Sequence, residues 1–181
     1  MRTLVFLALT LFFPLFANTQ EAEKQKLIHD ALLALPEHLR ESAMVASYDE
    51  VGNRTVLREG SGEIICQADD PTPGFFVSCF HRSAEPHFVH RRKWTSEGKS
   101  QEEKTELQLA GIKEGKLPHE QVGRAGYALM GANALTAPSL MVIYVPNATA
   151  ESTGLSTTPS NFRPWLMLAG TPLAHVMMPG N

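Results

Sequence analysis

The sequence predicts an α+β fold: a single domain with a mostly antiparallel sheet, an N-terminal amphipathic helix and a helical insertion in its middle. Short apolar runs separated by Gly, Pro and Asn fall into two groups, a pattern typical of strands. An apolar stripe at helical spacing precedes the first group, and a charged stretch with helix-start signals separates the two. With 181 residues, 43% of them hydrophobic, the chain is long enough to bury one core.

Residues 1–19 have the features of a cleaved signal peptide. Arg2 precedes an apolar run that extends to about Pro14, and the residues after it allow cleavage behind Ala17 or Thr19. The run is shorter than the roughly 20 residues that cross a bilayer, which favours export over the alternative of an N-terminal membrane anchor. We therefore expect a mature domain over 20–181, in the periplasm or outside the cell, with no transmembrane anchor after cleavage.

The first helix is expected over 20–35, where Pro36 ends it. Its apolar residues recur at helical spacing, so one face should dock on the core. These residues are Leu27, Ile28, Ala31, Leu32 and Leu35.

Four strands are expected next, over 43–49, 55–59, 63–67 and 75–80. Each is short and ends at turn residues, which is typical of an antiparallel meander. The sequence Gly60-Ser61-Gly62 between the second and third is interpreted as a hairpin loop.

Cys66 and Cys79 are the only cysteines, and an even number favours a disulfide in an oxidising compartment. They enclose 12 residues that include Asp70-Pro71 and Pro73-Gly74, steps that favour a reversal of the chain. A bridge over a loop of this size would contribute about 3 kcal/mol. Two separate buried thiols are the alternative, and no Cys-x-x-Cys motif indicates redox catalysis.

Two helices are expected in the middle of the chain. Ser83 is a candidate cap for a helix over 84–96 that has Pro86 in its first turn. Ser100 and Glu103 form a capping box for a second helix that ends at Gly115. Its apolar face is thin and its charges are many, so we expect it to lie on the surface.

Four more strands are expected over 126–130, 140–145, 165–169 and 173–178, with a long Ser/Thr-rich loop over 148–161. The segment 140–145 is apolar on both faces and should be a central strand covered on each side. We expect the helices to pack on one face of the sheet.

Three sequence blocks together resemble a family of uncharacterised exported bacterial proteins. The blocks are VLREG at 56–60 with the two cysteines around Pro73-Gly74, GYALMG at 126–131, and AGTPLAHVMMP at 169–179. The last block is the most specific, and the resemblance extends from about Leu35 to the C-terminus. It implies export and a shared fold, and it implies no catalytic residue because the family has no assigned activity.

His175 is the strongest candidate for chemistry. In a strand it shares a face with Met177, and an imidazole and a thioether together suit a copper ion outside the cytoplasm. The alternative is a core histidine bonded to a backbone group, with methionines filling gaps around it.

His87 and His90 are the second candidate, three residues apart on the face of a helix that could give zinc two ligands. His81 and Glu85 are the nearest residues in the sequence that could supply further zinc ligands. The stretch from Arg82 to Lys93 also forms a basic patch that could contact an anionic partner. A solvated helix face is the alternative.

A formal net charge of −3 argues against nucleic acid as a partner, and no catalytic or cofactor motif is found in the sequence. We therefore expect no cofactor, and a binding or structural protein without an identifiable active site. The alternatives are an envelope protein that binds copper or zinc, and an enzyme whose residues converge around His175. That enzyme would draw on His119, Tyr127 and the 148–161 loop.

Overall fold

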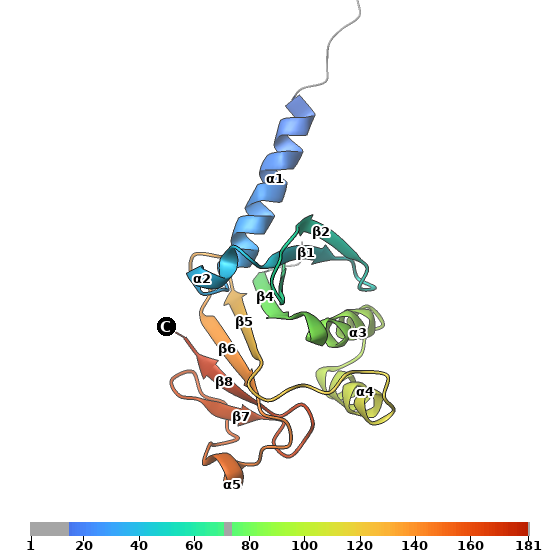
Figure 1. The fold of residues 1–181 in the computed structure, drawn as a ribbon, viewed down its shortest axis with the longest axis vertical. Helices are drawn as coiled ribbons and strands as arrows, with labels where there is room; N and C mark the ends of the chain where they lie inside the picture. The colour runs from blue at the N-terminus through green and yellow to red at the C-terminus, as the bar shows by residue number, and fades with distance from the viewer. Residues whose placement is uncertain (1–14, 71–73, 181) are drawn as a thin grey trace, which may run out of the picture.

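The computed structural model describes the backbone of residues 15–70 and 74–180. Most of the predicted signal peptide, residues 1–14, and the tight turn expected at 71–73 lie outside the described residues. Helix α1 (Leu15–Leu32) crosses the two predicted cleavage positions and extends away from the rest of the fold in Figure 1. Export therefore stays a prediction from the sequence.

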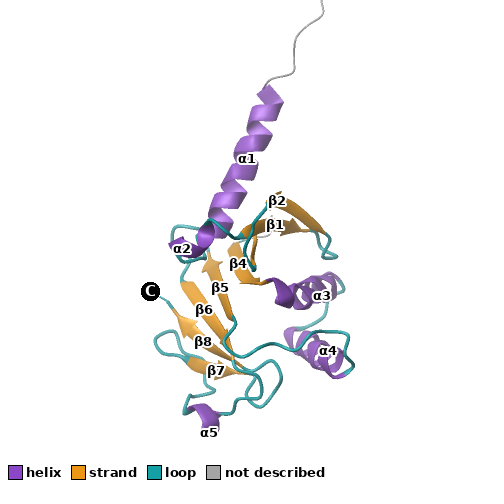
Figure 2. Ribbon diagram, viewed as in Figure 1, coloured by secondary structure: helices purple, strands orange, loops and turns teal. Residues whose placement is uncertain are grey.

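The described residues form one eight-stranded sheet in the order β2-β1-β3-β4-β5-β6-β8-β7, together with helices (Figures 1 and 2). This arrangement confirms the α+β class and the mostly antiparallel sheet. The strands are β1 (Met44–Tyr48), β2 (Arg54–Arg58), β3 (Ile64–Gln67), β4 (Phe75–His81), β5 (Ala125–Gly131), β6 (Ser139–Tyr144), β7 (Trp165–Met167) and β8 (His175–Pro179).

Helices pack on both faces of the sheet, which corrects the expectation of one covered face. Side chains of a strand alternate between its faces. On one face, Val45 and Cys79 lie buried against Ile28 of α1. On the other face, Phe80 stacks on Phe88 of α3 (Glu85–Ser96) with ring centroids 3.9 Å apart. The sheet core is therefore apolar on both sides at β1, β3 and β4.

The first four strands are not the simple meander that their spacing suggests. β3 pairs with β1 in parallel, so it lies between β1 and β4 and not beside β2. The chain must therefore cross the start of β1. At Gly60 an added Cβ would lie 2.2 Å from the backbone nitrogen of Met44, so only glycine fits this crossing. The segment is a close crossover and not the expected hairpin loop.

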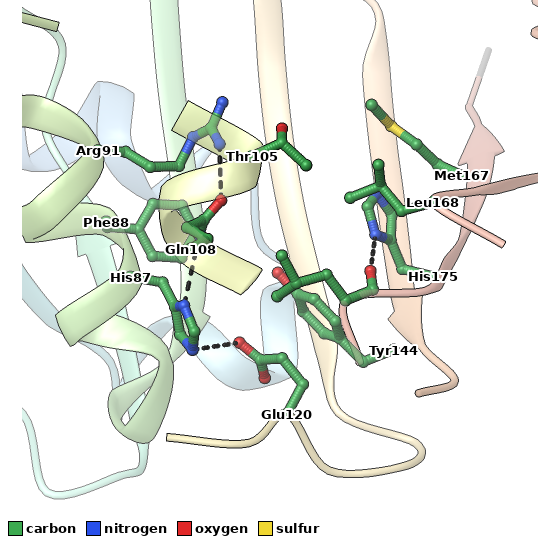
Figure 3. Close-up of a pocket in the computed structure, with 11 residues that line it drawn as sticks. His87, Phe88, Arg91, Thr105, Gln108, Glu120, Tyr144, Met167, Leu168 and His175 are labelled. Carbon is green, nitrogen blue, oxygen red and sulfur yellow. Dashed lines mark hydrogen bonds and ion pairs between the residues drawn. The ribbon is translucent and has the colours of Figure 1, made fainter. Parts of the chain in front are cut away.

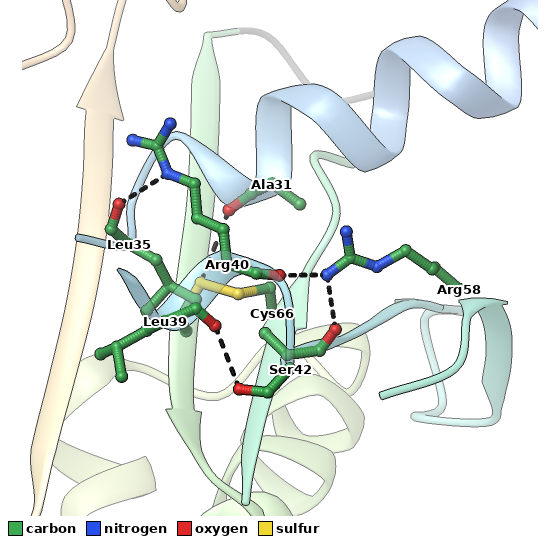
Figure 4. The surroundings of a disulfide bond; sticks show 9 residues. Ala31, Leu35, Leu39, Arg40, Ser42, Arg58 and Cys66 are labelled. Atoms are coloured by element: carbon green, nitrogen blue, oxygen red, sulfur yellow. Dashed lines mark hydrogen bonds between the residues drawn. A yellow bond between two sulfur atoms is a disulfide. The ribbon is translucent and has the colours of Figure 1, made fainter. Parts of the chain in front are cut away.

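The predicted disulfide between Cys66 and Cys79 is confirmed. The two residues are direct partners in the β3–β4 register, and both sulfurs lie in the core beneath α1 (Figure 4). Nearby, Arg58 Nη2 donates to the carbonyl oxygens of Arg40, at 2.5 Å, and Ala43, at 2.6 Å. These bonds fix β2 to the segment between α2 (Glu37–Arg40) and β1.

The two middle helices form close to their expected positions. The capping box of Ser100 and Glu103 is present at the start of α4 (Gln101–Lys113). Ser83 is not a cap for α3: its backbone N–H donates to the His81 side chain in a short 3₁₀ turn (Arg82–Ala84) that precedes the helix. Pro86 lies in the first turn of α3, as expected.

The C-terminal half of the sheet is less covered than the sequence suggests. β6 is an inner strand, paired with β5 and β8, but all its residues are only half-buried. The 148–161 segment contains a short helix, α5 (Ala150–Thr153), capped by Thr149. Among the described residues, no helix combines the length and apolar character needed to span a membrane.

Candidate functional site

A cavity of about 210 Å³ lies between the helical insertion and the C-terminal strands (Figure 3). α3 and α4 form one wall, and β6, β7 and the start of β8 form the other. At roughly 30 Å³ per water molecule, this volume corresponds to about seven waters. The residues that line it are His87, Phe88, Arg91, Thr105, Gln108, Glu120, Tyr144, Met167, Leu168, Leu173 and His175.

His87 is held in one orientation by a chain of hydrogen bonds that begins at Arg91. Arg91 Nη1 donates to Gln108 Oε1 at 2.6 Å, so the amide nitrogen of Gln108 faces His87 Nδ1 at 3.3 Å. His87 Nδ1 is then the acceptor, and its Nε2–H donates to the Pro118 carbonyl oxygen at 2.9 Å. Burial also lowers the pKa of His87, so the ring is neutral with both nitrogens engaged.

Glu120 places a buried carboxyl group beside this histidine. Its Oε1 lies 3.7 Å from His87 Nε2, and its Oε2 has no hydrogen-bond partner in the described structure. Burial raises the pKa of the carboxyl group from 4.5 to about 7, although the charge of Arg124 opposes the rise. Glu120 is therefore able to give or take a proton near neutral pH.

The loop between α4 and β5 positions Glu120. Leu117 is buried with Ile112 of α4 and with Leu173 in the turn before β8, which anchors the start of this loop. At its end, Gly123 N–H donates to the Tyr144 carbonyl oxygen at 2.9 Å and continues the β5–β6 pairing. Because both ends are fixed, the carboxyl group of Glu120 is held against the cavity.

His175 lies opposite, on the sheet side of the cavity. Its Nδ1–H donates to the Leu173 carbonyl oxygen at 2.7 Å, which leaves Nε2 as an acceptor without a partner among the described residues. Tyr144 is its neighbour across the β6–β8 ladder, with ring centroids 5.6 Å apart. Burial lowers the pKa of His175, while burial and then the charge of Glu120 raise the pKa of Tyr144.

Each of the two predicted metal-binding pairs, His87 with His90 and His175 with Met177, has only one member in this cavity. His87 and His175 line it, but their partners do not. His90 Nδ1 bonds the Pro86 carbonyl oxygen at 2.8 Å and its ring contacts Trp94. Met177 pairs with Trp165, and the methionine opposite His175 is Met167 of β7.

A metal ion would find few free ligands here. His87 uses both ring nitrogens, so it would have to break its bonds to Gln108 and Pro118 before binding one. Across residues 15–70 and 74–180, no group of three or more His, Cys, Asp or Glu side chains is placed to hold a metal ion. Of the described residues that line the cavity, only His175 has an imidazole nitrogen without a hydrogen-bond partner.

None of the residues expected to converge with His175 lines the cavity. His119 is exposed beside Glu120, and Tyr127 packs against the α1 face of the sheet. The 148–161 segment contributes no residue to the cavity wall. The polar residues that line the cavity together with His175 include Tyr144, Glu120 and His87.

Sequence reasoning missed the polar face of α4. Lys104, Gln108 and Ile112 are buried at successive turns, so the buried stripe of this helix is largely polar. The prediction placed α4 on the surface because its apolar face is thin and its charges are many. Of the apolar residues on this helix, Leu107 is exposed and Ile112 is buried. The sequence does contain one signal of this face: Lys104 and Gln108 are spaced four residues apart in line with Ile112, so all three lie on the same side of the helix.

The cavity combines groups that can exchange protons with an apolar wall. The Glu120 carboxyl, the Tyr144 hydroxyl and His175 Nε2 can each bond a ligand, while Leu168, Leu173 and Phe88 supply apolar contact. No protein-family model, no curated protein and no solved structure that was compared with this chain matches it.

Proposed function

We propose that this chain is an exported protein that binds a small ligand in the cavity between α3, α4 and the C-terminal strands. The proposal depends on one observation: the Glu120 side chain is 3% exposed, and one of its oxygens, Oε2, has no hydrogen-bond partner among the described residues. A buried carboxyl oxygen without a hydrogen bond costs about 1–3 kcal/mol or more. A ligand that donates a hydrogen bond to it would remove this cost.

The cavity defines the kind of ligand. Its volume of about 210 Å³ is below the 300 Å³ or so at which pockets for drug-sized molecules begin. Its wall is apolar at Phe88, Leu168 and Leu173 and polar at Glu120 and His175. The ligand we propose is compact and largely apolar, with one group that donates a hydrogen bond, such as a hydroxyl or an amine.

Export rests on the sequence of residues 1–19 and agrees with the buried disulfide, since disulfides persist mainly in oxidising compartments. The resemblance to exported bacterial proteins over 35–181 supports the same location. Expression of the full chain in a bacterium, followed by mass spectrometry of the envelope fraction, tests this part. A mature form that begins at Asn18 or Gln20 supports it, and an intact cytosolic chain with two free thiols contradicts it.

Ligand binding is testable with methionine methyl groups as reporters. Met167 lines the cavity, whereas Met130 is exposed on β5. The protein is labelled with ¹³C at its methionine methyl groups and titrated, by NMR, with phenol, p-cresol, benzyl alcohol and imidazole. At least one compound of this panel should shift the Met167 methyl signal and leave the Met130 signal unchanged. If no compound in the panel moves Met167, the proposal is wrong.

A variant that fills the cavity provides the specificity test. Thr105 lines the cavity from α4, so Thr105→Leu should occupy part of it and weaken binding at least about tenfold. Glu106→Leu introduces the same side chain on the exposed side of the helix and should leave binding unchanged. Equal binding by wild type and Thr105→Leu would place the compounds elsewhere and overturn the proposal.

A further inference from the structure

A second cavity of about 570 Å³ lies beside the first, and it contains more positive than negative charge. Arg91 and Phe88 of α3 line both cavities. The second, which we call the basic groove, is also lined by Arg92, Thr95 and Lys104.

Lys104 is the unusual residue of the basic groove. It is 5% exposed, yet no carboxylate of the described chain lies within ion-pair distance of it. Its one side-chain hydrogen bond to a described residue joins Nζ to the neutral hydroxyl of Thr95 at 3.0 Å. Buried charges in proteins are normally paired, because removing an ammonium group from water is costly.

Arg91 has no acidic partner in the described part of the chain either. Its guanidinium donates to the amide oxygens of Gln108 and Gln101, both at 2.6 Å and both neutral. Its charge also contributes to lowering the pKa of Lys104, after burial, so the two cations are close enough to repel.

The acids of the basic groove do not compensate this charge. Both oxygens of Asp70 accept from Arg92 Nη2, at 3.1 and 2.8 Å, so this pair is neutral on its own. Glu50 lines the basic groove, but it is exposed and makes no ion pair with a described residue. Within residues 15–70 and 74–180, Arg91 and Lys104 are thus two cations without a compensating acid.

We propose that the basic groove binds a small organic anion, with its anionic group between Lys104 and Arg91 and an apolar body against Phe76 and Phe88. Phe76 is 40% exposed and lines the basic groove with Phe88, which gives the apolar part a surface to cover. A volume of about 570 Å³ is within the range of pockets that hold small organic ligands. This site is separate from the proposed function and extends beyond it.

Calorimetric titration of Thr105→Leu, in which the first cavity is partly filled, with three ring compounds tests the charge preference of the basic groove. Benzoate and phenyl phosphate share their ring with benzylamine, which carries the opposite charge. We expect both anions to bind, benzylamine not to bind, and the anion affinity to fall between about 0.05 and 0.5 M NaCl because salt screens the interaction. Phenyl phosphate binding without benzoate binding would assign phosphate esters, and the reverse would assign carboxylates.

Lys104→Met tests the residue itself, and it should weaken anion binding at least about tenfold because a charged hydrogen bond is lost. Lys113→Met, on the exposed side of the same helix, is the matched control and should bind as wild type does.

If Lys104→Met does not fold, Lys104→Gln keeps a donor for Thr95 and removes the charge. Undiminished anion binding in the folded Lys104 variant, or equal binding of benzylamine and the two anions by Thr105→Leu, would overturn the proposal. Thr105→Leu should leave anion binding intact, which separates this site from the first cavity.

Discussion

Replacing Glu120 by glutamine tests the most unusual group in the structure. The carboxyl group is buried beside a neutral histidine, and burial raises its pKa from 4.5 to about 7. Glutamine has nearly the same shape and carries no charge at any pH. The variant therefore removes the cost of ionising this buried group and retains the packing around it.

The size and sign of the effect follow from the two pKa values. Between about pH 4.5 and 7 the folded chain holds a proton on Glu120 that the unfolded chain has lost. The free energy of unfolding of the wild type therefore falls as the pH rises through this range. A pKa raised from 4.5 to about 7 corresponds to about 3 kcal/mol once the group is ionised.

Urea denaturation of both proteins, at several values from about pH 4 to about pH 8, measures this effect. Relative to wild type, Glu120→Gln should gain about 3 kcal/mol across the range, with most of the gain between about pH 5 and 7. His87 and His175 have lowered pKa values, so they act in the opposite direction and destabilise the fold as the pH falls. Both proteins carry them, and the difference between the two curves isolates Glu120.

Parallel curves for wild type and variant would refute the reasoning, because they would mean that Glu120 has the same pKa in the folded and unfolded chain. Glu106→Gln is the matched control, an exposed carboxylate on α4 with no ion pair among the described residues. Its substitution should change the free energy of unfolding by no more than about 0.5 kcal/mol.

Two further predictions concern the fold. Replacing Cys66 and Cys79 together by alanine should lower the free energy of unfolding by about 3 kcal/mol in urea denaturation, since the bridge closes a loop with a sequence separation of 13; an unchanged urea midpoint would contradict a disulfide-stabilised core. Gly60→Ala should destabilise the chain by about 3 kcal/mol or more, because the added Cβ would lie 2.2 Å from the Met44 nitrogen. Gly126→Ala, whose Cβ would meet nothing closer than 3.7 Å, is the control for Gly60 and should be tolerated.

The strands and the disulfide could be predicted because their signals are local. Alternating apolar residues and turn residues mark each strand, and the positions of Cys66 and Cys79 on either side of a turn place them opposite each other. The pairing of β3 with β1 is a different kind of property. It depends on a backbone crossing at Gly60 that no local pattern describes.

The site was harder to predict than the fold because its residues come from separate elements. His87 and His175 were identified as candidates, but each was given a neighbour on its own helix or strand. In the structure their neighbours are Glu120, from a loop, and Tyr144, from the adjacent strand. Only the fold brings these groups to one cavity, and a lone glutamate in a polar loop carries no local signal of burial.

The central claim is tested most directly by a crystal structure at near-neutral pH. The crystal should contain whichever of phenol, p-cresol, benzyl alcohol and imidazole binds most tightly. We expect the compound in the cavity between α3, α4 and the C-terminal strands. Its hydrogen-bonding group should lie within about 3.2 Å of a Glu120 carboxyl oxygen or His175 Nε2. A compound bound outside this cavity, with Glu120 Oε2 still unpartnered, would contradict the account.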